Sequence, residues 1–210
     1  MEIICLFTNT FDLHRRSEQL VPRDNEPLQE GTYYTSMMGT VTISDELVVT
    51  SMEAIDTGRR CRFFPDAVRQ RDRGCAITGT VAELGHHGVW WSFEAAHIYP
   101  LAYQGHWDEK NYDRWVKILP ANGSDTKLNS IQNGILLRRD IHSHFDAYDV
   151  SINLDDHYGI TCFSPALLGL NIAGRHLDQT FLDKKNRPTD QILRWHFRQA
   201  VLVNMRRDET

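Results

Sequence analysis

Two histidines and an asparagine stand at positions where their side chains could do chemistry. His97 lies at the end of the apolar run 89–98, just before Pro100. Asn133 precedes a glycine, and His142 follows nine residues later. A neutral imidazole, with an ordinary pKa of about 6.5, can exchange a proton near neutral pH. The pattern therefore predicts acid–base chemistry shared by His97 and His142.

The elements that must position these residues form a strand, a loop, a second strand and a helix. The first strand covers 89–98, the second follows the Asn-Gly pair at 135–137, and the helix covers 139–146. In such a unit the strand end and the helix meet, so we expect His97 and His142 to face each other across a small cleft. Asn133 is expected to fix the loop through its side-chain amide.

The remaining pattern predicts an α+β fold with additional N-terminal strands and a C-terminal helix. We divide the chain into a β-rich N-terminal extension at 1–58 that packs on the core, a ββα domain at 59–165, and a loop and helix at 166–210. Within these segments we expect strands at 1–10, 40–50, 149–154 and 158–163, helices at 64–73, 107–118, 125–131 and 190–206, and polar loops at 14–32 and 171–189.

Composition excludes several classes of protein. The chain has 210 residues, 41% of them apolar, and a formal charge of −5, which is ordinary for a globular protein. No apolar run approaches the roughly 18 residues that a membrane-spanning helix needs. Four cysteines without a CxxC pair argue against a zinc ribbon or a disulfide scaffold, and they indicate an intracellular protein of the cytoplasm or nucleus.

Charge and aromatic residues each allow two interpretations. Residues 1–58 carry 3 basic and 10 acidic side chains, so any contact with nucleic acid must be a local patch elsewhere. Six arginines between 59 and 73 could contact phosphates or could form a solvated helix face. The aromatic residues near His97 could be core or could line an apolar pocket; they are Trp90, Trp91, Phe93, Tyr99, Tyr103, Trp107, Tyr112 and Trp115.

Three blocks of the sequence resemble a known family. They are Glu94-Ala95-Ala96-His97-Ile98-Tyr99-Pro100, Asn133-Gly134-Ile135-Leu136-Leu137 and Asp140-Ile141-His142-Ser143-His144-Phe145-Asp146. In this order they resemble the HNH endonuclease signature, in particular that of HNH domains found in many fungal proteins. Cys75-Ala76-Ile77-Thr78-Gly79 resembles the block that precedes the first histidine. The resemblance covers residues 62–164 and implies a ββα-metal unit.

The resemblance also implies roles for individual residues. His97 would be the general base that activates water, Asn133 the residue that fixes the loop, and His142 a ligand of a divalent metal such as Mg²⁺. The chain departs from the family pattern at Ala96, where the family usually has a metal-binding Asp or His. Glu94 and Asp146 are the other predicted ligands. The predicted substrate-binding residues are Arg138, Arg139, Trp107 and Tyr99.

Three functions follow from this pattern and stay open at this point. The first is a metal-dependent HNH-type endonuclease that hydrolyses phosphodiester bonds of nucleic acid. The second is a metal-independent acid–base enzyme, a cyclase or isomerase acting on a small organic substrate, built on the same scaffold. The third is an inactive interaction module with 1–58 as its partner surface. None involves a membrane, and a homo-oligomer is an open possibility.

Overall fold

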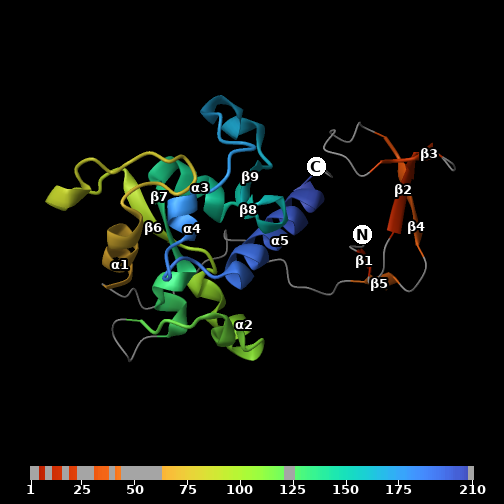
Figure 1. The fold of residues 1–210 in the computed structure, drawn as a ribbon. Helices are drawn as coiled ribbons and strands as arrows, with labels where there is room; N and C mark the ends of the chain where they lie inside the picture. The colour runs from red at the N-terminus through yellow and green to blue at the C-terminus, as the bar shows by residue number, and fades with distance from the viewer. Residues whose placement is uncertain are drawn as a thin grey trace. The chain divides into compact units, whose positions relative to one another are not determined.

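The computed structural model describes residues 5–7, 11–15, 19–22, 31–37, 41–43, 63–120 and 126–207 (Figure 1). The chain divides into two units, Met1–Leu47 and Val48–Thr210, and each is described by itself. Residues 44–50 of the predicted second strand lie outside the described residues, as do three of the six arginines, Arg59, Arg60 and Arg62. The boundaries expected at 58 and 165, and the packing of the N-terminal extension on the core, remain predictions.

The first unit consists of short antiparallel strands. β1 (Cys5–Phe7) pairs with β5 (Val41–Ile43), and β2 (Phe11–Arg15) lies between β3 (Gln19–Leu20) and β4 (Tyr33–Met37). The loop predicted at 14–32 is therefore wrong for the end of β2 and for β3. The polar composition of this segment suggested a loop, but contacts between side chains on neighbouring strands can stabilise polar strands. Here His14 Nε2 lies 2.7 Å from Ser36 Oγ, and Arg15 donates to the Tyr33 hydroxyl at 3.1 Å.

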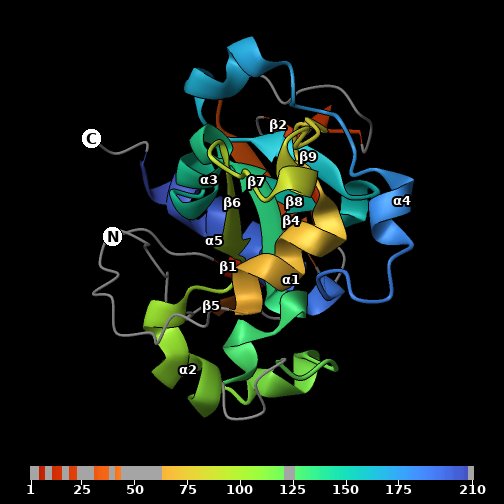
Figure 2. The same ribbon diagram turned by 90° about the vertical axis from the view of Figure 1, so that its left-hand side faces the viewer.

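The centre of the second unit is the predicted strand–loop–strand–helix arrangement. β6 (Phe93–His97) pairs antiparallel with β7 (Gly134–Arg138), and α3 (Arg139–Asp146) follows β7 directly. α1 (Phe63–Asp72) packs on one face of this hairpin and α3 on the other (Figure 2). The two faces follow the alternation of a strand: Ala96 and its partner Ile135 belong to the main core, whereas Leu136 packs with α1.

Gly134 is required by close packing and not by a turn. The sequence suggested an Asn-Gly turn, but Asn133 ends a 3-10 helix and Gly134 begins β7 in an extended conformation, with φ of −121°. A Cβ atom at this position would come within 2.5 Å of Val68 Cγ2 and 2.7 Å of the Phe64 ring. Glycine therefore lets α1 lie directly on the start of β7.

The connection between β6 and β7 is a series of short helical turns. They are η4 (Leu101–Tyr103), α2 (Gln104–Glu109), η5 (Tyr112–Trp115), η6 (Lys127–Asn129) and η7 (Ile131–Asn133). The helix predicted at 107–118 is split between α2 and η5. The helix predicted at 125–131 is two 3-10 turns, because the hydroxyls of Thr126 and Ser130 each cap a new turn by accepting from Leu128 N and Gln132 N.

The C-terminal part agrees with the pattern in most elements. β8 (Val150–Asn153) and β9 (Gly159–Cys162) form a hairpin through η8 (Leu154–Asp156), and α5 (Asp190–Arg207) packs on β8. The remaining turns are η3 (Gly85–His87) and η9 (Pro165–Leu170). One helix falls in the predicted loop at 171–189: α4 (Gln179–Leu182), which is capped by Asp178 accepting from Thr180 N at 2.7 Å. None of the helices in the described ranges is long and apolar enough to cross a bilayer.

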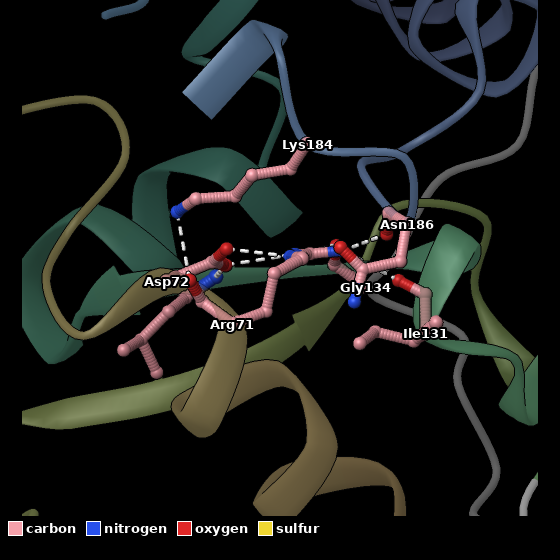
Figure 3. A network of polar contacts seen from close by, with 7 residues as sticks. Arg71, Asp72, Ile131, Gly134, Lys184 and Asn186 are labelled. Carbon is pink, nitrogen blue, oxygen red and sulfur yellow. Dashed lines mark hydrogen bonds and ion pairs between the residues drawn. The ribbon is translucent and has the colours of Figure 1, made fainter. Parts of the chain in front are cut away.

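Arg71 and Asp72 tie α1 to the hairpin in the interior of the second unit. Both side chains are 1% exposed, and the guanidinium donates twice to the carboxylate, at 2.5 and 2.7 Å. The guanidinium also donates to three carbonyl oxygens, those of Ile131, Gly134 and Asn186 (Figure 3). Neither interpretation of the arginine run describes Arg71, because it is neither on a solvated face nor free to contact phosphate.

His196 joins α5 to the end of α3. The imidazole is 2% exposed and stacks on Phe145 with ring centroids 3.8 Å apart. Its Nε2 lies 3.2 Å from the carbonyl oxygen of Phe145, so this nitrogen carries the proton and Nδ1 accepts from the Ser151 hydroxyl at 2.7 Å. Burial lowers the pKa of His196 to about 3, which keeps the ring neutral.

The buried imidazole predicts a loss of stability in mild acid. The unfolded state binds a proton at His196 below its ordinary pKa of 6.5, whereas the folded state does so only near pH 3. The stabilisation is therefore complete above pH 6.5 and falls as the pH drops from 6.5 towards 3. We expect His196→Gln to reduce the pH slope of the unfolding free energy by about 1.4 kcal/mol per pH unit in this window. Urea unfolding at pH 7, 6, 5 and 4 measures both slopes, and equal slopes would contradict the assignment.

Candidate functional site

Glu94, His142 and Asp146 meet at the surface of the second unit. Glu94 lies on the face of β6 that α3 covers, and His142 and Asp146 are one helical turn apart on α3. His142 Nδ1 lies 2.8 Å from Glu94 Oε2, and His142 Nε2 lies 3.3 Å from Asp146 Oδ2. The side chains of His142, Glu94 and Asp146 are 22%, 37% and 50% exposed, so solvent reaches the cluster. The structure thus brings together the three residues that the sequence predicted as metal ligands.

Burial and the neighbouring charges shift the pKa of both carboxylates in this cluster. The hydrogen bond with His142 holds the pKa of Glu94 below its usual range, and Arg139, which donates to Glu94 Oε1 at 2.9 Å, adds to this against the effect of burial. Partial burial raises the pKa of Asp146, and the charge of Glu94 raises it further, whereas the charge of His142 opposes both. Glu94 is therefore the firmly anionic member, and Asp146 is the carboxylate that gains most from a nearby cation.

The side chains of this cluster are of the chemical types that bind divalent ions. Carboxylate oxygens and an imidazole nitrogen are common ligands of Mg²⁺, Mn²⁺ and Zn²⁺. In the described part of the chain, no three His, Cys, Asp or Glu side chains are arranged around a common point as metal ligands would be. Here the two carboxylates contact opposite ring nitrogens of His142. An ion between Nε2 and Asp146 would leave Glu94 on Nδ1–H, the arrangement that commonly orients metal-binding histidines.

Ala96 cannot be replaced by an acidic ligand without a penalty. Its side chain is fully buried opposite Ile135, inside the main core. An aspartate there would bury a carboxylate among apolar side chains.

Asn133 fixes the loop, as the sequence predicted. Its side chain is fully buried; Oδ1 accepts from Tyr99 N at 2.8 Å, and Nδ2 donates to the carbonyl oxygens of Tyr99 and Leu128 at 3.0 and 2.9 Å. These bonds join the two ends of the long connection just beyond His97. Because the amide is enclosed, Asn133 positions the strand end and does not itself reach a substrate. Its effect on catalysis remains a prediction.

His97 lies on the face of β6 that carries α1. Its ring stacks on Phe64 with centroids 3.8 Å apart and planes 7° apart, and Nε2 lies 3.2 Å from Asn129 Oδ1. The expectation that His97 faces His142 is wrong in its geometry, because alternation puts Glu94 on one face of the strand and His97 on the other. No hydrogen bond joins the two imidazoles within the described residues.

The environment of His97 keeps its imidazole neutral. Burial lowers the pKa of His97 to about 4, against the opposing effect of the hydrogen bond with Asn129, and the charge of His142 lowers it further. With Nε2–H donated to the Asn129 oxygen, Nδ1 is the nitrogen that can accept a proton. The sequence carried no signal for Asn129 or for the stacking partner Phe64, since both lie far from His97 in the chain.

The predicted substrate-binding residues divide into two pairs. Arg138 donates to Asp140 and Arg139 to Glu94, and both guanidinium groups are at the surface, 33% and 67% exposed. Tyr99 and Trp107 are 0% and 1% exposed and pack edge to face with centroids 4.9 Å apart. They form core between β6 and α2 and offer no surface to a substrate.

Comparison with known proteins finds a family match for the segment that holds this cluster. Residues 75–153 match the family model described as HNH endonuclease, and residues 1–42 match one described as a domain of unknown function (DUF8573). No curated protein and no solved structure matches the chain. The first match covers β6, β7, α3 and β8 and supports an HNH-family domain there. At the level of the family, such a domain is of nuclease type and implies nucleic-acid binding.

Proposed function

We propose that this protein is a metal-dependent endonuclease that hydrolyses phosphodiester bonds. The observation that carries the proposal is His142, whose two ring nitrogens contact Asp146 and Glu94 at an exposed edge of the segment that matches the HNH family. A strand carboxylate, a helix imidazole and a helix carboxylate converge there, beside the exposed guanidinium of Arg139.

Each residue of the cluster has a distinct role in this proposal. His142 Nε2 and Asp146 would hold a divalent ion, which would neutralise the charge that develops on the phosphate. Glu94 accepts a hydrogen bond from His142 Nδ1–H. This bond fixes the orientation of the ring, so that Nε2 faces Asp146. Arg139 places a positive charge beside the cluster, where a phosphate oxygen could accept from it.

His97 is the general base in this proposal. It is neutral at physiological pH, it is held rigidly between Phe64 and Asn129, and its pKa responds to the charge of His142. Nδ1 would take the proton from the attacking water.

No feature of the residues that the structure describes favours the metal-independent enzyme. That hypothesis rested on the missing ligand at Ala96, the acidic surface and an aromatic pocket beside His97. Of the aromatic residues, Tyr99 and Trp107 are enclosed in the core, and Tyr112 stacks on Trp115 at 3.9 Å. The closer relation to fungal HNH proteins, the intracellular location, a homo-oligomer and the interaction surface at 1–58 remain predictions of the sequence. The choice between DNA and RNA is part of the test below.

The test is cleavage by the purified 210-residue chain. Supercoiled plasmid and a long single-stranded RNA are incubated with Mg²⁺ or Mn²⁺, and in parallel with EDTA. We expect internal cleavage of at least one substrate with metal and none with EDTA. Asp146→Asn, which keeps the size of the side chain but weakens it as a ligand, should require more metal for half-maximal cleavage. Cleavage that persists in EDTA, or no cleavage of either substrate with any metal, would rule the proposal out.

A further inference from the structure

Trp91 is the most exposed large apolar side chain in the described part of the chain, with 80% of its surface in solvent. Its neighbour Trp90 is half-buried, packs with the α1 side of the hairpin and has the Arg69 guanidinium 5.6 Å from its ring. An indole left in water forgoes a large hydrophobic gain and is one of the commonest anchors in binding surfaces. Packing within the fold therefore explains a tryptophan at position 90 but not the exposed one at position 91.

The backbone places Trp91 beside the candidate site. Arg139 N, the first amide of α3, donates to the carbonyl oxygen of Ser92 at 3.0 Å. Trp91 is thus one residue from a direct contact with the start of the helix that carries His142 and Asp146. It also ends the loop containing η3, which projects from the rest of the second unit (Figure 1).

The surroundings of Trp91 suit a nucleic acid. The guanidinium of Arg139 is 67% exposed although it donates to Glu94, and Arg138 lies opposite Phe93 in the neighbouring strand. Arg73 is exposed at the base of the loop, where its carbonyl oxygen accepts from Ala82 N. Carboxylates are also near, since Asp140 pairs with Arg138 and Asp66 with Arg69. Arg139 and Arg73 are thus exposed cations on the elements that adjoin the loop of Trp91, although carboxylates pair with some of the neighbouring arginines.

We infer that Trp91 stacks on an unpaired nucleobase of the substrate and so places the adjoining phosphate at the Glu94–His142–Asp146 cluster. This inference rests on the proposed function and deepens it by naming single-stranded or locally unpaired nucleic acid as the substrate class. The same loop also exposes Val81 and Leu84, at 59% and 55%, but neither side chain can stack on a base. The ring of Trp91 can stack on one base, and the exposed guanidinium of Arg139 nearby favours a nucleic acid over an apolar protein partner.

The experiment measures binding without cleavage. Fluorescence anisotropy in EDTA compares a labelled single-stranded oligonucleotide, in DNA and RNA versions, with the duplex of the same sequence. We expect the wild type to bind the single strand more tightly than the duplex. Trp91→Ala should weaken binding of the single strand about 5- to 100-fold, the usual worth of one base–aromatic stack. Trp91→Phe should stay within about 3-fold of the wild type, because it keeps an aromatic face.

Two further variants separate stacking from other effects. Trp91→Leu is large and apolar but cannot stack, so it should behave like Trp91→Ala. Leu168→Ala removes another exposed side chain, 69% exposed on η9, and should change nothing. Full binding by Trp91→Leu would indicate a general apolar contact, such as one with a protein, and would overturn the inference. So would wild-type binding by Trp91→Ala, or no binding of any oligonucleotide.

The outcome is independent of cleavage. If the wild type cuts nucleic acid and Trp91→Ala binds and cuts equally well, the inference fails and the proposed function stands. If no substrate is cut but binding depends on the aromatic ring at position 91, the inference stands and the proposed endonuclease fails.

Discussion

His97→Ala is expected to lower the cleavage rate about 10²- to 10⁴-fold, the usual contribution of a general base. The concentration of metal that gives half-maximal cleavage should not change, because His97 contacts Phe64 and Asn129 and not the Glu94–His142–Asp146 cluster. His97→Gln should be equally slow, since an amide can hydrogen-bond to Asn129 but cannot take up a proton from water. Single-turnover cleavage over a metal titration measures both quantities.

His142→Ala provides the contrast, because it removes a proposed ligand. Its half-maximal metal concentration should rise, and activity should recover in part at high metal. His144→Ala is the matched control on the same helix: His144 Nδ1 lies 2.9 Å from Asp149 Oδ2, and no hydrogen bond or ion pair among the described residues joins His144 to the cluster. Circular dichroism checks the fold of each variant. If His97→Ala keeps full activity while His144→Ala loses it, the base has been assigned to the wrong histidine.

The acid limb of the rate profile follows from the same environment. A general base works when it is neutral, and burial lowers the pKa of His97 to about 4. The part of the rate that depends on His97 should therefore persist below pH 6.5 and fall only as the pH approaches 4. Because His196 destabilises the fold in the same range, the fraction of folded protein has to be measured at each pH. A loss of rate centred on pH 6.5 in fully folded protein would contradict the burial of the base.

Local patterns predicted the elements and one half of the site. α3 has the bounds expected from the sequence, because Ile141 and Phe145 repeat at helical spacing and bury one face. The same helical spacing places His142 and Asp146 on one side of α3. The alternation of side chains along a strand places Glu94 on the face of β6 that α3 covers. The cluster could therefore be predicted from two local rules and the order of the elements.

The surroundings of His97 and Arg71 could not be predicted in this way. The alternation of side chains along β6 already implied that Glu94 and His97 lie on different faces of the strand. That α1 covers the face of His97 is known only from the tertiary structure. The arginines of α1 suggested a surface helix because charge is normally solvated. Burial of Arg71 depends on carbonyl groups of Ile131, Gly134 and Asn186, which lie 60 to 115 residues away in the chain. No local pattern reports contacts at that separation.

Arg71→Met should be the most destabilising single change in the second unit outside the apolar core. The variant would leave the Asp72 carboxylate buried, with the amide of Leu136 still donating to it, and would remove the guanidinium that donates to the carbonyls of Ile131 and Asn186. Removing one member of a buried, hydrogen-bonded ion pair commonly costs about 3–5 kcal/mol. We expect a loss of that size in the free energy of unfolding, measured by urea denaturation at pH 7.

A matched pair at the surface separates burial from the loss of an ion pair. Arg194 donates to both carboxylate oxygens of Asp155 at 2.9 and 2.8 Å, as Arg71 does to Asp72, but these side chains are 56% and 73% exposed. Arg194→Met should therefore cost less than about 1 kcal/mol. The double variant Arg71→Met/Asp72→Leu should be more stable than Arg71→Met alone, because it leaves no unpaired buried charge. Equal losses for Arg71→Met and Arg194→Met would show that the interior pair does not hold α1 on the hairpin.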